Sequence, residues 1–167
     1  MIVKMSNTSE NYVRTYIKVN DEFLCFETFE REFPDPEYLD GAIDLVINGV
    51  QIHGFDTWDF IDGMWSALIS GMREVIRSGS YLEGFPDSAI ELVMQPVGSH
   101  KVRIAIEKLE TRDASVVADR NTTFRMLCDE GRSFLRQMDQ RLPQHRESTA
   151  PLKEYLEEIE AAIRTTH

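Results

Sequence analysis

Near the start of the chain, apolar and polar residues alternate in two short runs that predict a β-hairpin. Residues 12–19 have the two-residue period of a half-buried strand. Asn20 and Asp21 favour a turn, so residues 22–28 are predicted to return as a second strand. The register of this hairpin places Ile17 opposite Leu24 and Thr15 opposite Phe26.

A second hairpin is predicted around Asn48-Gly49, which lies between the alternating runs 43–47 and 50–53. Both turn residues tolerate the positive φ that a two-residue type I′ turn requires. The predicted register pairs Ile47 with Val50, Val46 with Gln51, Leu45 with Ile52 and Asp44 with His53.

An apolar stripe with steps of three and four residues predicts a long helix after this hairpin. Asp56-Thr57 would cap the helix, which would run to about Ser78. The stripe is wide enough to pack against a sheet and a second element together, which makes this the central helix. Its members are Trp58, Ile61, Trp65, Leu68, Met72 and Val75.

Three further strands are predicted over residues 80–84, 89–95 and 101–109, while residues 111–118 fit either a last strand or a loop. The expected pairs across the second and third strands are Ile90 with Ile106, Leu92 with Ile104 and Met94 with Val102.

Two more apolar stripes predict two helices at the end of the chain. Pro143 ends the first helix, and Pro151 lies in the first turn of the second, where its missing N–H is harmless. The stripes are Phe124, Leu127, Leu135, Met138 and Leu142 in the first helix, and Leu152, Tyr155, Leu156, Ile159 and Ile163 in the second.

The order of these elements predicts an α+β fold, with an antiparallel sheet of about six to seven strands. One long central helix and two C-terminal helices would pack on one side of the sheet. A chain of 167 residues is the usual size of one domain, so residues 1–167 are expected to fold together. Residues 1–11 are polar and expected to be frayed.

Acidic residues outnumber basic ones by 29 to 18, for a formal net charge of −11. The excess lies almost entirely in residues 1–110, since residues 111–167 are close to neutral. Such a charge repels nucleic acid and anionic membranes and favours a cationic partner. Solubility is the alternative reason for it.

The sequence contains no catalytic motif, no P-loop and no pair of histidines at metal-ligand spacing, so neither a metal nor a cofactor is predicted. It also has no apolar run typical of a signal peptide or a membrane span, and a cytoplasmic protein is therefore expected. In that compartment Cys25 and Cys128 would be reduced thiols rather than a disulfide.

Three small sets of residues have both a chemical and a structural interpretation. Asp44 and His53 could act as an oriented general base, or form a cross-strand pair that only stabilises the hairpin. Asp56, Asp59 and Asp62 could bind Mg²⁺, or complement the dipole at the start of the central helix. Trp58 and Trp65 could stack on a ligand or belong to the core. The structural interpretation is favoured in each case.

The segment 27–40 combines six acidic residues with three aromatic ones and a single base, Arg31. Aromatic side chains surrounded by carboxylates are typical of an interface with a basic protein. An ordinary loop whose rings pack under the sheet is the alternative. The predicted partner-binding residues are Phe29, Glu30, Glu32, Phe33, Asp35, Glu37, Tyr38 and Asp40.

Arginines give the penultimate helix a basic face, which we expect to form ion pairs with the acidic last helix rather than to bind nucleic acid. The arginines are Arg120, Arg125, Arg132, Arg136 and Arg141, and the expected acidic partners are Glu154, Glu157, Glu158 and Glu160.

The motifs at 43–49, 54–59 and 64–65 (IDLVING, GFDTWD and MW) resemble those of small, uncharacterised bacterial α+β proteins. Some such proteins accompany toxins as immunity proteins. The resemblance covers about residues 41–107 and implies a compact, acidic, non-enzymatic protein, but it transfers no functional residue.

These features predict an acidic binding protein without enzymatic activity, of the immunity or inhibitor type, which occludes a basic partner such as a toxin domain. The alternatives are an enzyme with a site near Asp44 and His53, a subunit of a larger assembly, or a homodimer.

Overall fold

The computed structural model describes residues 10–85, 87–108 and 113–165. Within these ranges the strands form two antiparallel sheets. The N-terminal sheet has the order β2-β1-β3-β4, with β5 beside β3, and the C-terminal sheet has the order β6-β7-β8-β9. The strands of the N-terminal sheet are β1 (Tyr12–Val19), β2 (Glu22–Cys25), β3 (Asp40–Ile47), β4 (Val50–His53) and β5 (Asp59–Phe60). Those of the C-terminal sheet are β6 (Tyr81–Gly84), β7 (Ile90–Val97), β8 (Lys101–Lys108) and β9 (Ala114–Asp119).

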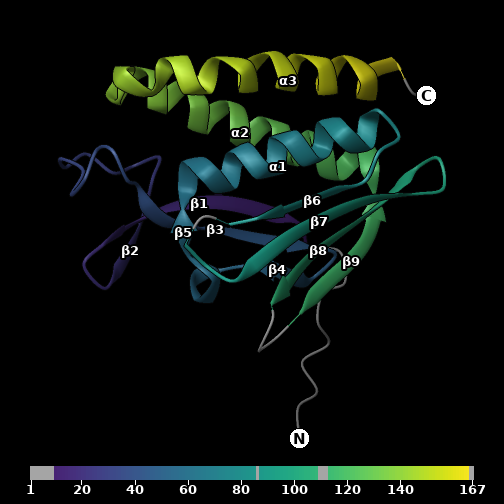
Figure 1. Cartoon of the computed structure of the whole chain (residues 1–167), viewed down its shortest axis with the longest axis horizontal. Coiled ribbons are helices and arrows are strands. Elements are labelled where there is room, and N and C mark those ends of the chain that lie inside the picture. The colour runs from purple at the N-terminus through teal and green to yellow at the C-terminus, as the bar shows by residue number, and fades with distance from the viewer. Residues whose placement is uncertain (1–9, 86, 109–112, 166–167) are drawn as a thin grey trace, which may run out of the picture.

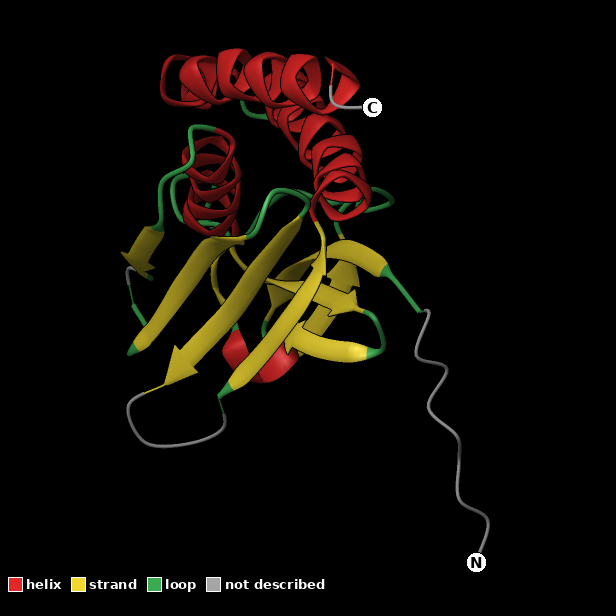
Figure 2. Ribbon diagram, turned by 90° about the vertical axis from the view of Figure 1, so that its right-hand side faces the viewer, coloured by secondary structure: helices red, strands yellow, loops and turns green. Residues whose placement is uncertain are grey.

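Three long helices cover one side of the two sheets (Figures 1 and 2). The helices α1 (Ile61–Ile76) and α2 (Arg120–Arg141) contact strands, while α3 (Arg146–Thr165) forms an outer layer against α1 and α2. The predicted α+β class and the position of the helices are confirmed. The strands are divided between two sheets where one was predicted, because α1 separates β5 from β6 and β6 pairs only with β7 among the described strands.

The first hairpin has the predicted register. Ile17 lies opposite Leu24, and the backbone N–H of Phe26 donates to the carbonyl of Thr15 at 2.9 Å. The start of the chain is more ordered than predicted at residues 10–11, since Glu10 O accepts from Gly49 N–H and Asn11 Oδ1 accepts from Asn48 N–H. The rest of the predicted frayed segment, residues 1–9, lies outside the described residues.

The turn of the second hairpin is confirmed, because Asn48 and Gly49 have φ values of 51° and 75°. Beyond the first two pairs the register shifts at a β-bulge, and Leu45 lies opposite His53. The predicted pairs of Leu45 with Ile52 and of Asp44 with His53 are therefore wrong. The extra residue turns both Ile52 and His53 toward buried surroundings.

The central helix begins later than predicted, at Ile61. Asp56-Thr57 belongs instead to the short 3₁₀ helix η1 (Phe55–Thr57), and the two residues of β5 pair with Asp40 and Gly41 of β3. The apolar pattern would allow a helix over residues 56–60, but pairing of residues 59–60 with β3 delays its start. Trp65 is fully buried as predicted.

In the C-terminal sheet, β7 extends to Val97, two residues beyond its predicted end, and is joined to β8 by a tighter turn, in which Gly98 has a φ of 61°. The register is shifted by two residues, so the observed pairs are Leu92 with Ile106, Met94 with Ile104 and Pro96 with Val102. A shift of two keeps each side chain on its predicted face, and the core residues are correct although their partners are not. The ambiguous segment 111–118 forms β9 from residue 114 onward.

Helices α2 and α3 are separated by the single-turn helix η2 (Pro143–His145). Pro143 ends α2 as predicted, but α3 begins at Arg146, so Pro151 lies inside the helix rather than in its first turn. Buried side chains from both sheets and from all three helices form one hydrophobic cluster.

Candidate interaction surface

The segment 27–40, here called the acidic loop, leaves β2 and returns to β3 at one end of the molecule. Its residues Glu30, Glu32, Asp35 and Glu37 are exposed. Asp40 is partly buried, and burial raises the pKa of its carboxyl, against the effect of the nearby Lys18 ammonium. The carboxylates that sequence reasoning singled out therefore face solvent, except for that of Asp40.

The rings of the acidic loop differ in exposure. Tyr38 is 62% exposed, Phe33 is partly buried, and Phe29 is only 6% exposed. Phe33 packs against Phe26 and Phe29, with ring centroids 5.9 and 5.4 Å apart. The prediction that Phe29 is an accessible anchor is wrong in this conformation, since its ring is part of the core.

The acidic loop is attached to the end of α2 and to η2. The Arg141 guanidinium lies over the rings of Phe33 and Phe29, at 4.3 and 5.5 Å from their centroids. Its Nη2 also donates to the carbonyl of Arg31 at 3.1 Å, and His145 Nε2 lies 2.6 Å from the carbonyl of Pro36. These contacts, made from outside the loop, fix its conformation.

A shallow hollow of about 440 Å³ lies between the acidic loop and Arg141. It is lined by Glu30, Arg31, Glu32, Phe33, Pro36 and Arg141. The lining is largely charged and open to solvent, which suits contact with a protein better than enclosure of a small molecule.

A second set of solvent-accessible rings, half-buried in Tyr16 and Phe23 and exposed in Phe55 and Trp58, lies on the face of the N-terminal sheet that is turned away from the three long helices, and is here called the aromatic row. It consists of Tyr16, Phe23, Phe55 and Trp58. Phe55 lies in η1, which sits below the sheets in Figure 2, and its ring contacts those of Tyr16 and Phe23 at 4.9 and 4.8 Å. Phe55 and Trp58 are 41% and 42% exposed.

The predicted burial of Trp58 is wrong, because this residue precedes α1 instead of belonging to its apolar stripe. The ammonium of Lys18 lies 4.7 Å from the centre of the Trp58 ring, an arrangement that stabilises a cation over an aromatic face. Sequence reasoning missed the aromatic row since its members come from β1, β2, η1 and the segment after η1.

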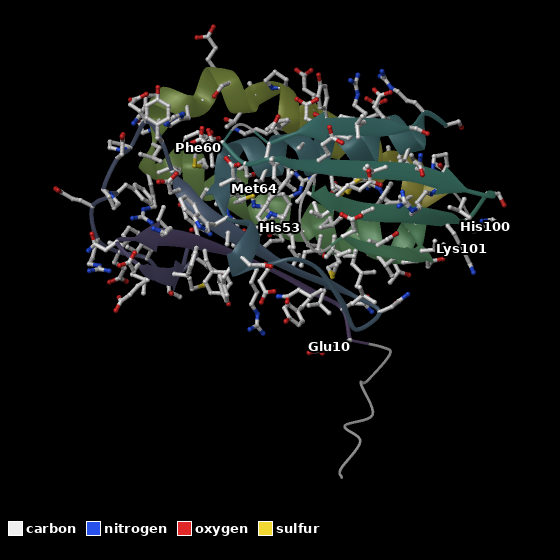
Figure 3. The ribbon with its side chains drawn as sticks, turned by 60° about the horizontal axis from the view of Figure 1, so that its bottom comes forward. Glu10, His53, Phe60, Met64, His100 and Lys101 are labelled. Carbon is white, nitrogen blue, oxygen red and sulfur yellow. The ribbon has the colours of Figure 1, made fainter. Side chains whose placement is uncertain are left out.

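Contrary to the prediction, Asp44 and His53 do not lie opposite each other in the hairpin. Asp44 accepts a hydrogen bond from Gln51 Nε2 at 3.0 Å. His53 is 4% exposed, with Nδ1 2.7 Å from the carbonyl of Ile43 and its ring edge against Phe85. The cavity beside it has a volume of only about 10 Å³. Figure 3 shows His53 near the centre of the molecule, whereas His100 lies at the far tip of the β7–β8 hairpin.

The three aspartates predicted to lie at the start of the central helix are separated. Asp62 lies in the first turn of α1, where a carboxylate is favoured, but Asp56 lies in η1. Asp59 is buried and accepts hydrogen bonds from Phe60 N–H, Asp87 N–H and Ser88 Oγ. Among the residues that the structure describes, no three potential ligands are grouped so that they could hold a metal ion.

The expected ion pairs between α2 and α3 are confirmed only in part. Arg132 binds Glu160 with a shortest distance of 2.5 Å. Glu158 instead binds Arg73 and Arg77 of α1, each at 2.7 Å, which the sequence did not indicate. Arg141, which was expected to pair with the last helix, instead contacts the acidic loop.

Comparisons with protein-family models, with curated proteins and with solved structures give no match for this chain. The resemblance to toxin-immunity proteins therefore stays a prediction. In the described part of the chain, no helix combines the length and the apolar character needed to cross a membrane.

Proposed function

We propose that this protein is a non-enzymatic binding protein that occludes a basic protein partner, as an immunity or inhibitor protein does. The observation that carries the proposal is the acidic loop, whose exposed carboxylates are presented by a backbone fixed to α2 through Arg141 and to η2 through His145. A surface that is already ordered loses less conformational entropy on binding, so more of its contact energy is retained as affinity.

The charge of the surface defines the class of partner. The acidic loop holds six of the 29 acidic residues and one of the 18 lysines and arginines of the chain. Carboxylates gathered in this way steer a cationic protein toward the site and speed association, and salt screens their effect. Binding is therefore expected to weaken steeply as the salt concentration rises.

The proposal is tested by affinity capture from a lysate of the source organism with two charge-reversal variants in parallel. The loop variant carries Glu30→Lys, Glu32→Lys and Glu37→Lys. Asp35 is kept, because its Oδ1 accepts a hydrogen bond from the backbone of residue 37 and supports the loop. We expect the wild-type protein to retain a basic protein at low salt and the loop variant to lose it.

The matched control reverses three exposed charges on α3, through Glu147→Lys, Glu154→Lys and Glu157→Lys. It has the same net charge as the loop variant, so retention of the partner by the control alone assigns binding to the acidic loop. Equal loss in both variants, or capture that does not respond to salt, contradicts the proposal.

A further inference from the structure

The aromatic row adjoins the acidic loop. The ring of Tyr38, at the end of the loop, packs against Phe60 with centroids 5.5 Å apart, and Phe60 follows Trp58 by two residues. Lys18, which lies over the Trp58 ring, is also near Asp40, where its positive charge partly offsets the rise that burial causes in the pKa of that carboxyl. The acidic loop and the aromatic row thus meet around Tyr38 and Asp40.

The composition of the aromatic row differs from that of the acidic loop. Rings from three elements contact one another, and Phe55 and Trp58 each expose about two fifths of their surface. Large aromatic groups that are partly exposed and packed side by side supply the apolar contact area typical of the centre of a protein interface. In the acidic loop Tyr38 alone has a comparably exposed ring, since Phe29 is buried and Phe33 is partly buried against the core.

Charge decides which occupant fits this face. Asp21, Glu22 and Asp56 are exposed around the row, and the whole chain carries −11. A second copy would bring the same excess of negative charge to the contact, which opposes self-association through this face. The Lys18 ammonium over Trp58 shows that a cation can be accommodated against these rings.

We infer that the aromatic row is the apolar half of the interface, and that it binds a segment of the basic partner in which apolar side chains stand next to lysine or arginine. This inference rests on the proposed function and extends it from the acidic loop to the outer face of the N-terminal sheet. The carboxylates attract the partner, and Phe55 and Trp58 supply the contact that holds it.

The probe is a heptapeptide of alternating lysine and leucine, with a heptapeptide of alternating glutamate and leucine for comparison. The chain has two tryptophans, so its NMR spectrum contains two indole N–H signals, which Trp58→Phe assigns. The Trp65 indole is buried and bonded to Thr15, and its unchanged signal verifies that each variant is folded. We expect the basic peptide to shift the Trp58 signal and the loop amides in a saturable way.

Phe55→Ala is expected to weaken binding of the basic peptide by about tenfold, as for the loss of an interface anchor. The control is Leu82→Ala, which removes an apolar side chain that is 62% exposed on β6 of the other sheet, and it should leave binding unchanged. Equal shifts with the acidic peptide overturn the inference.

The two failures are distinguishable. If the loop amides shift while the Trp58 signal and the effect of Phe55→Ala are absent, the inference fails and the proposed function stands. If the Trp58 signal shifts with the basic peptide but the loop amides do not, the role proposed for the acidic loop fails. If neither responds, both are wrong.

Discussion

The indole Nε1 of Trp65 donates a hydrogen bond of 3.1 Å to the hydroxyl of Thr15, fifty residues away in the chain. Because an indole N–H can only donate, the Thr15 oxygen accepts this bond and its own proton is directed to Glu130 Oε1, at 3.2 Å. The chain of hydrogen bonds links α1, β1 and α2, and it brings a carboxyl group to the edge of the core.

Glu130→Gln is expected to stabilise the protein at neutral pH. Burial raises the pKa of the Glu130 carboxyl, although the hydrogen bond from Thr15 opposes the shift. A group whose pKa is raised by folding contributes stability below its ordinary pKa and loses that contribution as the pH rises through the raised value. Glutamine stays neutral and can still accept the bond from Thr15.

Thermal unfolding of Glu130→Gln should therefore occur roughly 1–3 °C above that of the wild type at neutral pH, a modest rise because solvent still reaches the side chain. The difference should vanish below the ordinary glutamate pKa. Asp129→Gln, at an exposed neighbouring position, is the control. A lower melting temperature for Glu130→Gln at neutral pH would contradict the assignment.

Gly41→Ala is expected to destabilise the protein by at least about 3 kcal/mol. A Cβ atom at this position in β3 would lie 2.0 Å from the carbonyl oxygen of Tyr16, which is backbone of the paired strand β1 and cannot rotate away. Gly84→Ala is the matched control, because a Cβ at this strand position meets no other atom within 4 Å. Its effect should stay within about 0.5 kcal/mol by chemical denaturation.

Arg141→Ala is expected to loosen the acidic loop without unfolding the protein. The change removes the cation over Phe33 and Phe29 and the hydrogen bond to the Arg31 carbonyl. Amides of the loop should exchange with deuterium at least about tenfold faster, while those of β3 and β7 keep their rates. Arg136→Ala, at an exposed position of the same helix, should leave the loop unchanged.

The features that the sequence predicted correctly depend on neighbours in the chain. Asn48-Gly49 makes a turn wherever it lies between alternating strands, and the stripe containing Trp65 forms a helix that must bury one face. These local signals were enough to establish the α+β class and most of the core. The Arg132–Glu160 ion pair could also be predicted, because a basic helix and an acidic helix follow each other directly in the sequence.

The features that were missed depend on long-range packing. One example is the bulge that separates Asp44 from His53, and another is the pairing of Asp59-Phe60 with β3. Both depend on which side chains become buried against distant parts of the chain, and the apolar period of the sequence does not contain that information. The same holds for Trp58, whose exposure follows from the late start of α1. Thr15 was read as one position in an alternating strand, although its hydroxyl connects Trp65 with Glu130.

Glu158→Gln is expected to weaken the attachment of α3 to α1. Hydrogen bonds from Arg73 and Arg77 lower the pKa of the Glu158 carboxyl. A lowered pKa contributes stability that is present above the ordinary glutamate pKa and is lost as the pH falls through the lowered value. The variant should thus melt below the wild type at neutral pH and low salt, and equally with it at acidic pH or high salt. Glu154→Gln, exposed on the same helix, is the control for loss of a charge.

The two cysteines are expected to differ in reactivity, because neither forms a disulfide and only Cys25 is exposed. Burial raises the pKa of the Cys128 thiol to about 12, and the nearby Glu160 and Asp129 add to the effect. Since the thiolate is the reacting species, a thiol reagent at mildly alkaline pH should modify one equivalent in the folded protein and the second only in denaturant. Cys25→Ser should abolish the fast reaction and leave the slow one, whereas modification of Cys128 in the folded variant would show that the interface between α2 and α3 opens.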